Sequence, residues 1–388
     1  MIMRILQLGK FYPIRGGVEK VMYDLTLGLS EKEIYCDMLC ASTEDHVAEP
    51  IRLNNYGQVI VLNTKVKMAA TMIAPDMVST LRRIKHRYDI IHIHHPDPMA
   101  TLALFLSGYK GKVVLHWHSD ILKQKALLKL YSPLQSWLIR RADIIVGTTP
   151  VYVDDSPFLQ YVKHKIDYIP IGTLPVQSAE EKVAQIRDKY PNKCLIFSLG
   201  RLVEYKGYEY LIRSALFLDD NYHIVIGGKG PLEAELKDLI VELKVEDKVT
   251  LLGYVSDAEV GDYFQAADIF CLSSILKTEA FAIVQIEAMS CGKPVVCSFI
   301  PGSGVSWVNR HGFSGLVVDQ KNPQSLAEAF HEIYTDKTLF EQLKWGSRNR
   351  YENHFTRDKM VQKCMDIYAR TFVQQKGKTV QPQKINSL

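Results

Sequence analysis

Residues 279–298 read EAFAIVQIEAMSCGKPVVCS. Glu279 and Glu287 enclose an almost wholly apolar stretch of helical character, and a Gly-Lys-Pro turn then leads into a β-branched run. The runs on either side, Ile269–Ser273 and Pro294–Ser298, are short and apolar throughout, which is typical of strands buried on both faces. A strand, a helical segment and a second strand in this order predict a parallel α/β unit.

The same alternation of apolar runs and helical segments extends along the chain as two series. The polar residues Pro175–Glu181, which show no periodicity, separate them. We therefore predict an α/β fold with two doubly wound, Rossmann-like domains: residues 1–174, completed by a C-terminal helix within 358–388, and residues 175–357. Ligands bind at the carboxyl ends of parallel strands, so the functional residues are expected in a cleft between the two sheets.

The remaining expected elements follow the same two patterns. The further strands are Arg4–Gly9, Cys36–Ala41, Val59–Leu62, Ile90–His95, Val113–His118, Ile144–Thr148 and Ile166–Ile171 in the first series, and Leu195–Gly200, Ile224–Gly228, Val249–Val255 and Gly315–Val318 in the second. Helical periodicity is clearest at Val18–Leu29, Ser325–Tyr351 and Lys359–Phe372.

Composition narrows the class of protein. A chain of 388 residues with 47% apolar and 23% charged side chains indicates two folded domains and excludes disordered, collagen-like and coiled-coil proteins. Seven cysteines without a Cys-x-x-Cys pair argue against a disulfide framework and a structural zinc site. The start of the chain does not resemble a secretory signal, so we expect a cytoplasmic protein. The net charge of +4 is too small to indicate a nucleic-acid partner.

Two loops carry residue types that bind phosphate. Gly16-Gly17 follows the first strand and precedes a helix, so its backbone N–H groups are open to an anion, although a turn that needs positive φ explains the pair equally well. Arg201 and Lys206 follow the first strand of the second series, and two cations there fit a diphosphate better than solvated surface charge. Gly227–Pro231 also joins a strand to a helix, and we interpret it as a structural turn.

Glu279 and Glu287 are candidates for binding sugar hydroxyls, because an ionised carboxylate accepts hydrogen bonds from two adjacent OH groups. Glu279 stands where the helix after Ile269–Ser273 is expected to begin, so capping that helix is its alternative role. Glu287 lies within an apolar segment, where capping does not explain it and an unpaired buried charge would be costly. We therefore expect Glu287 to bind a polar ligand.

Five histidines lie near the ends of two expected neighbouring strands: His92, His94, His95, His116 and His118. Alternation places His92 and His94 on one face of the sheet, and likewise His116 and His118. No cysteine or metalloprotease spacing accompanies them, and the sequence contains no Asp-x-Asp, so we predict no metal. We interpret them as polar residues of the cleft wall, where a sugar or an acceptor hydroxyl approaches.

Together these segments resemble the family 4 retaining glycosyltransferases, which have the GT-B fold of two facing Rossmann-like domains. The resemblance spans nearly the whole chain. Its most specific element is the Glu-x7-Glu motif of Glu279 and Glu287 with the Gly-Lys-Pro that follows. The supporting matches are Gly16-Gly17, His118 in His116-Trp117-His118-Ser119-Asp120, Gly200-Arg201 with Lys206-Gly207, and Gly228-Lys229-Gly230-Pro231.

The resemblance implies a role for each site residue. Arg201 and Lys206 would bind the diphosphate of a nucleotide-sugar donor, and Glu287 its ribose. Glu279 and His118 would contact the donor sugar and share in catalysis with the two cations. The other donor contacts would come from Gly16, Gly17, Phe281 and Ala282, and, flanking the base, from Tyr254 and Val255. The family needs no metal, so no metal or other cofactor is expected.

The implied function is retaining transfer of a sugar to a hydroxyl acceptor, such as a lipid-linked glycan in the biosynthesis of a cell-surface polysaccharide or lipopolysaccharide. No residue stands out as a covalent nucleophile, so a front-face route is expected. Two departures from the family pattern bear on donor choice: Ala282 stands where Gly is usual, and Pro301-Gly302-Ser303-Gly304 replaces a frequent Gly-Gly followed by an acidic residue. A sugar-nucleotide 2-epimerase of the same fold and a non-catalytic sugar-nucleotide-binding module are the alternatives.

Positive charge is concentrated in the N-terminal half, where residues 1–179 contain 21 basic and 16 acidic side chains. Contact with an anionic lipid surface would place the protein on the inner face of a membrane and would suit a lipid-linked acceptor. The candidate basic residues are Lys65, Lys67, Arg82, Arg83, Lys85, Arg87 and those of Lys123–Arg141. Helical spacing of Leu127, Leu130, Leu134 and Trp137 instead favours a helix packed on the sheet.

Overall fold

The computed structural model describes residues 3–44, 49–68, 71–121 and 125–373. The chain divides into two compact units. Unit 1 runs to Pro170 and is completed by the chain from Arg357 onward, and unit 2 is Ile171–Thr356. The sequence analysis placed these boundaries at residues 174 and 357. The part of the expected C-terminal helix beyond residue 373 lies outside the described residues.

Unit 1 is built on an eight-stranded sheet in the order β10-β9-β8-β7-β1-β2-β4-β3. Neighbouring strands are parallel except for β3 and β4. The strands are β1 (Arg4–Tyr12), β2 (Tyr35–Ser42), β3 (Ile51–Arg52), β4 (Gln58–Leu62), β7 (Ile90–His95), β8 (Lys112–Trp117), β9 (Ile144–Gly147) and β10 (Ile166–Tyr168). All seven strands expected in this half are present. The sequence analysis missed β3 and the hairpin of β5 (Val66–Met68) and β6 (Thr71–Ile73), which are too short to show a period.

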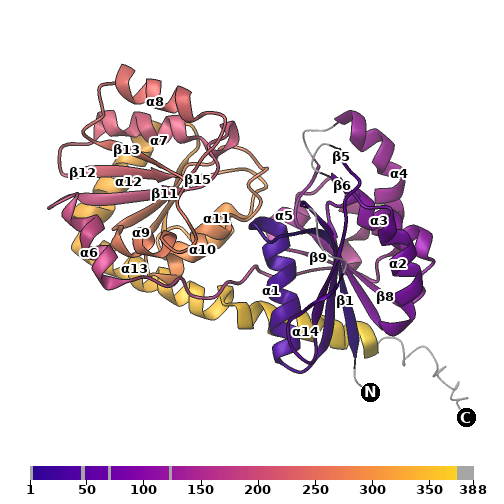
Figure 1. Cartoon of the computed structure of the whole chain (residues 1–388). Coiled ribbons are helices and arrows are strands. Elements are labelled where there is room, and N and C mark those ends of the chain that lie inside the picture. The colour runs from indigo at the N-terminus through magenta and orange to yellow at the C-terminus, as the bar shows by residue number, and fades with distance from the viewer. Residues whose placement is uncertain (1–2, 45–48, 69–70, 122–124, 374–388) are drawn as a thin grey trace, which may run out of the picture. The chain divides into compact units, whose positions relative to one another are not determined.

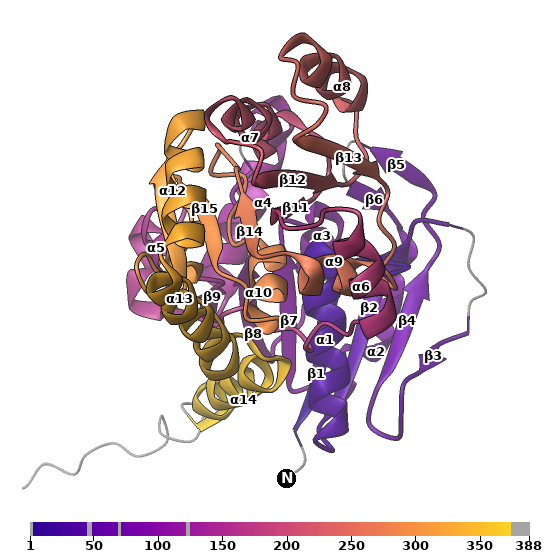
Figure 2. The same cartoon turned by 90° about the vertical axis from the view of Figure 1, so that its left-hand side faces the viewer.

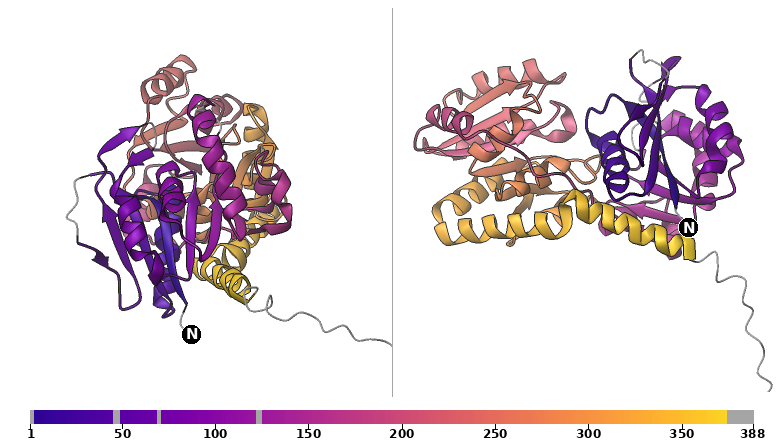
Figure 3. Two further views of the ribbon diagram at one scale, coloured as in Figure 1. Left: turned by 90° about the vertical axis from the view of Figure 1, so that its right-hand side faces the viewer. Right: turned by 60° about the horizontal axis from the view of Figure 1, so that its bottom comes forward.

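Helices cover both faces of the unit 1 sheet (Figure 1). Helices α1 (Gly17–Glu31) and α14 (Arg357–Val373) lie on one face, and α2 (Asp76–Ile84), α3 (Pro98–Ser107) and α4 (Lys125–Arg141) on the other. The views in Figure 3 show α14 running along unit 1. It packs so closely on α1 that a Cβ at Gly28 would lie 2.6 Å from Val361 Cγ2. The chain thus returns to complete the first sheet after building the second.

Unit 2 is built on a six-stranded sheet, parallel throughout, in the order β13-β12-β11-β14-β15-β16 (Figure 2). The six strands coincide with the expected runs to within two residues at each end: β11 (Cys194–Leu199), β12 (Tyr222–Gly227), β13 (Val249–Gly253), β14 (Ile269–Leu272), β15 (Val295–Phe299) and β16 (Gly315–Asp319). Its helices are α6 (Glu180–Asp188), α7 (Tyr208–Ser214), α8 (Glu233–Glu242), α9 (Val260–Ala266), α10 (Ile283–Ser290), α12 (Pro323–Thr335) and α13 (Lys337–Arg350).

Two layers of side chains hold the unit 2 helices on the sheet. Leu211, Leu236 and Phe330 of α7, α8 and α12 join one buried cluster with the strands. On the other face, Phe264 of α9 packs against Phe197 and Phe270. The single helical segment expected at Ser325–Tyr351 is two helices, because Asp336 leaves helical geometry and its carboxylate caps the first turn of α13. That expectation was wrong because helical periodicity continues on both sides of the break.

Both sheets reverse their strand order beside their first strand. In unit 1 the reversal lies between β1 and β7, and in unit 2 between β11 and β14. At such a switch point the loops leaving the two central strands diverge, which opens a ligand site at their carboxyl ends. The fold class is confirmed: two doubly wound, Rossmann-like units. Within the described residues, no helix is both long and apolar enough to cross a membrane.

Candidate functional site

The switch point of unit 2 carries an ion pair. Lys206 follows β11, Glu279 follows β14, and Lys206 Nζ lies 2.5 Å from Glu279 Oε2. Ser274 Oγ donates to the same carboxylate oxygen at 2.9 Å, and both charged side chains are 11% exposed. Burial lowers the pKa of Lys206, but the charge and hydrogen bond of Glu279 together with Tyr205 outweigh it, and the pKa lies above its usual range. Lys206 is therefore a fixed, charged ammonium group at neutral pH.

The sequence analysis gave capping of a helix as an alternative role for Glu279, but Glu279 does not begin a helix. Helix α10 starts at Ile283, and Glu279 lies in the preceding loop. That loop is held from outside, because Ser303 Oγ donates to the Glu279 carbonyl oxygen and Gly304 N donates to Ala280 O at 3.0 Å. The Pro301–Gly304 segment that departs from the family pattern is thus the support of this loop.

Arg201 and Glu287 occupy less enclosed positions than Lys206. Arg201 is exposed, and among the described residues its guanidinium makes no hydrogen bond or ion pair. Glu287, in the second turn of α10, is half-buried and has interactions of its own. Glu287 is thus less buried than its apolar neighbours in the sequence suggest, and its binding of a polar ligand stays a prediction. Its side chain remains accessible enough to accept hydrogen bonds from a ligand.

The other candidate donor contacts fall into two groups. Tyr254 is 68% exposed just after β13, and Val255 follows it and packs on the end of β12, where its Cγ2 would be 2.9 Å from a Cβ at Gly227. Phe281, in contrast, is buried with its ring edge-on to Phe355 at 5.9 Å. The Phe281 side chain therefore belongs to the core of unit 2.

The backbone around Ala282 and Gly228 explains two sequence features. Ala282 has φ +62°, a left-handed conformation that favours glycine, which is the residue usual in the family. A Cβ at Gly228 would lie 1.9 Å from Gly200 O, so the Gly227–Pro231 turn needs glycine for close packing. Its interpretation as a structural turn is confirmed.

In unit 1, Gly16 and Gly17 adopt φ of 121° and 63°, as the residue before α1 and its first residue. A Cβ at Gly16 would meet no atom within 4 Å. Glycine is thus required here by backbone conformation and not by packing. No side chain caps Gly16 at the start of the 15-residue helix α1, and the N–H groups of a helix N-terminus suit an anion.

Sequence reasoning missed Lys10 and Glu19, which lie beside these glycines. Lys10 Nζ donates to Pro96 O at 2.5 Å, and burial lowers its pKa although Asp97 and Glu19 oppose this. Burial raises the pKa of Glu19. A lone lysine and a lone glutamate form no motif; the only available signal was that Lys10 directly follows a glycine in the first buried strand.

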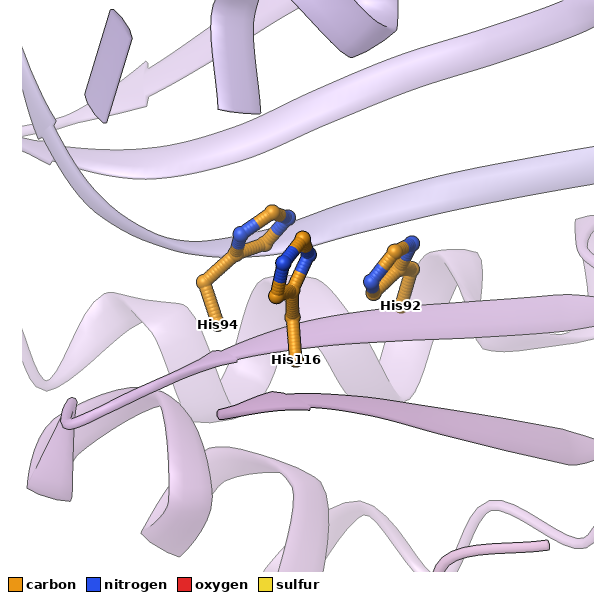
Figure 4. A group of neighbouring side chains, drawn as sticks. All are labelled: His92, His94 and His116. Atoms are coloured by element: carbon orange, nitrogen blue, oxygen red, sulfur yellow. The ribbon is translucent and has the colours of Figure 1, made fainter. Parts of the chain in front are cut away.

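The histidines are buried and do not form an open wall, so that part of the interpretation was wrong, while the contact of His118 with a donor sugar stays a prediction. His92, His94 and His116 are 0% exposed and His118 is 4% exposed. Their rings stack, with centroids 4.8 Å apart for His92 and His94 and 3.9 Å for His116 and His118, which confirms the faces assigned by alternation (Figure 4). Tyr368 of α14 lies against them, with Oη 2.6 Å from His92 Nδ1. They form a buried polar layer between the sheet and α14.

These rings also allow a test of metal binding. One nitrogen each of His92, His94 and His116 lies within 4.8 Å of the others. A tetrahedral metal needs ring planes that converge on one point, whereas these rings are stacked with interplanar angles of 15° to 28°. No carboxylate belongs to the group to offset a metal's charge. The arrangement fits a metal poorly.

Comparison with known proteins identifies the family. The description "Glycosyltransferase Family 4" matches residues 15–173 and "Glycosyl transferases group 1" matches residues 179–350. O-antigen chain mannosyltransferase C of Escherichia coli is 30% identical over 370 residues, which cover 94% of this chain and 98% of that protein. The chain belongs to the family 4 glycosyltransferases. D-rhamnosyltransferase WbpZ of Pseudomonas aeruginosa is also 30% identical, over 91% of this chain and 92% of that one.

Solved structures confirm the GT-B fold of this glycosyltransferase. HepE of Anabaena in complex with UDP superposes with a TM-score of 0.74 at 19% identity and covers 95% of this chain and 100% of that chain. WaaG, described as a glycosyltransferase involved in lipopolysaccharide biosynthesis, superposes with a TM-score of 0.66 at 16% identity, over 94% and 99%. The chain is therefore an enzyme of glycosyl transfer, and the epimerase alternative is not favoured.

Proposed function

We propose that this glycosyltransferase moves a sugar from a nucleoside-diphosphate sugar to a hydroxyl of a glycan acceptor with retained configuration. The observation that carries the proposal is the Lys206–Glu279 pair at the switch point of unit 2, with the unpaired guanidinium of Arg201 on the same strand end. Two cations suit a diphosphate, and a carboxylate suits sugar hydroxyls. HepE, which has the same fold, is described in complex with UDP-glucose.

The main chemical task is to stabilise the leaving group. Negative charge grows on the β-phosphate as the glycosidic bond breaks, and Lys206 is held in place and charged to meet it. Arg201 supplies the second cation. The charge on the leaving diphosphate is then stabilised by the side chains of Arg201 and Lys206, and we propose that no metal takes part.

Retention is expected to follow a front-face route. Glu279 is the carboxylate at this site, and its Oε2 is engaged by both Lys206 and Ser274. A carboxylate held by an ammonium group and a hydroxyl is a weak nucleophile, so Glu279 is better suited to accept hydrogen bonds from the donor sugar than to attack it. The oxygen of the acceptor hydroxyl then bonds to the anomeric carbon on the face that the diphosphate leaves, and its proton passes to the departing β-phosphate oxygen.

We propose that the acceptor is a growing, lipid-linked glycan of a cell-surface polysaccharide and that the sugar has the manno configuration. The support is that relatives spanning nearly the whole chain are named O-antigen chain mannosyltransferase C and D-rhamnosyltransferase. D-Rhamnose is mannose without its 6-hydroxyl group, so both names describe related sugars. Such an enzyme would work in the cytoplasm.

We further propose that unit 1 rests on an anionic membrane through α3 and α4. Leu130 is 80% and Phe105 47% exposed, so the apolar residues of α4 are only partly used in packing on the sheet. Neither helix contains an acidic residue, and Arg82 of α2 donates to Leu106 O beside them. Apolar side chains among basic ones suit anionic lipid. Lys123 of the expected basic segment lies outside the described residues.

Donor binding and turnover test the proposed function. Melting temperature is measured with UDP-glucose, UDP-N-acetylglucosamine, GDP-mannose and GDP-D-rhamnose, since a bound donor stabilises the folded state by mass action. Nucleoside diphosphate release is then measured with and without a glycan acceptor. Stabilisation by one donor and release that requires the acceptor are expected. Absence of stabilisation by all four, or release without transfer, would contradict the proposal.

Vesicle flotation tests the membrane surface. The protein is expected to float with vesicles containing phosphatidylglycerol, to release as salt rises and to lose binding in Leu130→Glu. Val241→Glu, at a position 61% exposed on α8 of unit 2, is the matched control. Vesicle binding that does not depend on salt or on anionic lipid would exclude this surface. Equal loss of binding in Val241→Glu and Leu130→Glu would exclude it as well.

A further inference from the structure

The carboxyl edge of the unit 2 sheet carries two further side chains beyond Lys206 and Glu279. Strands β11, β14, β15 and β16 lie side by side in this order, and Figure 2 shows the first three. Phe299 is the last residue of β15, and Asp319 is the last residue of β16. The two residues are partners in the parallel register, so their side chains point to the same face of the sheet. An aromatic ring and a carboxylate therefore lie next to each other at the edge where ligands bind.

Phe299 is exposed although the rest of its strand is buried. The other four residues of β15 are at most 2% exposed, whereas Phe299 is 51% exposed. Within the described residues its ring stacks on no other aromatic ring. Asp319 is exposed as well, and in the same part of the chain its carboxylate forms no hydrogen bond or ion pair. An apolar ring that the fold leaves uncovered at a ligand-binding edge indicates a ligand that covers it.

The loop after β15 ties Phe299 to the segment that carries Glu279. Ile300 directly follows Phe299 and is 3% exposed, and its carbonyl oxygen accepts from Ser303 N at 3.0 Å. Ser303 Oγ donates in turn to the carbonyl oxygen of Glu279. Neighbouring strands lie ~4.8 Å apart, which is close to the width of a pyranose ring. The strand of Phe299 thus lies about one sugar ring beyond that of Glu279, on the side away from the strand that Lys206 follows.

We propose that Phe299 and Asp319 form a second sugar subsite, which binds a pyranose residue of the acceptor glycan. The proposal rests on the proposed function, in which Lys206 meets the diphosphate and Glu279 the transferred sugar. A pyranose presents C–H groups on its face and hydroxyl groups at its rim. The exposed ring of Phe299 packs against the C–H face, and the carboxylate of Asp319 accepts hydrogen bonds from two adjacent hydroxyls.

The order of groups along the sheet edge assigns this subsite to the acceptor. A nucleotide sugar has one sugar beyond its diphosphate, and Glu279 meets that sugar in the proposed function. A growing glycan supplies further pyranose rings. An acceptor of several linked sugars can fill both the reacting position and the subsite, whereas a monosaccharide fills the reacting position alone. The enzyme should therefore prefer an oligosaccharide acceptor to a monosaccharide.

Binding of α-linked mannotriose tests the subsite without any donor, and this probe follows from the manno configuration proposed above. Its dissociation constant is measured on the full chain by saturation-transfer difference NMR. Phe299→Ala is expected to weaken binding about fivefold to tenfold, and Phe299→Tyr, which keeps the ring, to retain it. Asp319→Ala is expected to weaken binding about threefold.

Phe217→Ala is the matched control for this titration. Phe217 is 57% exposed in η4 (Ala215–Phe217), which precedes the amino end of β12, and its loss should leave mannotriose binding unchanged. Equal binding by the unmodified protein and Phe299→Ala would overturn the proposal. It would also be overturned if the unmodified protein did not bind mannotriose, or if Phe217→Ala lost as much affinity as Phe299→Ala.

Acceptor kinetics separate this subsite from the donor site. With the nucleotide sugar that stabilises the protein, Phe299→Ala should raise the KM of mannotriose about fivefold to tenfold. The KM of the nucleotide sugar and the KM of methyl α-mannoside, a monosaccharide, should not change. An equal rise in the KM of the nucleotide sugar would contradict the assignment to the acceptor, and so would an equal rise for methyl α-mannoside.

The two experiments separate failure of this inference from failure of the proposed function. If the unmodified protein transfers no sugar from any nucleotide sugar, the proposed function fails, and the mannotriose titration still decides the subsite. The melting temperature of Phe299→Ala shows whether this variant folds. If it does not, Phe299→Leu removes the aromatic ring but keeps an apolar side chain, and it is measured in its place with the same expected loss.

Discussion

The two switch points share a strand order and differ in their chemistry. In unit 2, Lys206 and Glu279 meet as charged partners 2.5 Å apart. In unit 1, Gln7, His94 and His118 are joined as neutral groups, because burial keeps the imidazoles unprotonated. A fixed cation suits a diphosphate that gains charge, whereas a neutral acceptor suits a hydroxyl whose charge does not change. In the proposed function, the same architecture serves two tasks through the residues placed at the carboxyl ends of the strands.

The largest expected effect comes from the charged site. Lys206→Ala removes a preorganised cation from the leaving diphosphate and is expected to lower kcat by about 10²-fold to 10³-fold. Lys237→Ala, which removes an exposed lysine paired with Glu233 on the same unit, is the matched control and is expected to leave kcat unchanged. Steady-state kinetics that show equal kcat values for both variants would remove Lys206 from the mechanism.

The partner of Lys206 has a separate effect on stability. Glu279→Gln leaves the ammonium buried without its counter-charge, and the free energy of unfolding is expected to fall by about 3 kcal/mol in denaturant titration. Burial, the largest influence, is then opposed only by Tyr205 and lowers the pKa of Lys206, so the alkaline limb of kcat should move to lower pH than in the unmodified protein. Glu233→Gln, in an exposed ion pair, should change neither the free energy of unfolding nor the alkaline limb of kcat. If Glu279→Gln left the alkaline limb unshifted, Glu279 would not control the pKa of Lys206.

We expect the buried, neutral histidines of unit 1 to make the stability of the protein sensitive to acid. Burial lowers the pKa of His116 to about 3, so an unfolded chain binds a proton there below about pH 6.5 that the folded chain does not. Stability from this histidine is complete above that pH and falls by about 1.4 kcal/mol per pH unit as the pH drops toward 3. His116→Phe keeps a ring in the stack and cannot titrate. Chemical denaturation from pH 7 to 4 should show that the free energy of unfolding of this variant falls less per pH unit than that of the unmodified protein. An equal fall in both proteins would contradict the prediction.

A smaller effect is expected at the loop that carries Glu279. Ala282 has a left-handed backbone, so Ala282→Gly relieves strain but adds freedom to the unfolded chain. The net gain in unfolding free energy is expected to be about 0.5–1 kcal/mol, measured by thermal denaturation. Ala288→Gly, in the middle of α10, is the control and should destabilise. Destabilisation by Ala282→Gly would show that the loop is not strained.

The two regions also differ in how well the sequence predicts them. The parallel strands of both sheets were predicted, because a strand buried on both faces is a continuous apolar run, whereas the two-residue antiparallel strand β3 was missed. Arg201, Lys206 and Glu279 were found because cations and carboxylates beside strand ends have few structural explanations. The break at Asp336 was missed, because a capping aspartate between two helical patterns looks like one more polar position.

In unit 1 the sequence located the histidines but not their surroundings. Tyr368 contacts His92 and Gln7 from a helix far along the chain, and no local sequence pattern predicts that contact. An alternating pattern shows which histidines share a face but not whether water or a helix covers it. Lys10 and Glu19 were missed for a related reason, since their proximity arises only from the fold.

Binding of UDP and GDP, which contain the diphosphate and the ribose but lack the sugar that is transferred, tests the division of tasks most directly. Isothermal titration calorimetry is carried out on the unmodified protein, Lys206→Ala and His118→Asn. The nucleoside diphosphate should bind Lys206→Ala at least about tenfold more weakly than the unmodified protein, because a charge-assisted contact is removed. It should bind His118→Asn and the unmodified protein with equal affinity. A loss of affinity in His118→Asn as large as that in Lys206→Ala would contradict the assignment of diphosphate to unit 2 and hydroxyl to His118.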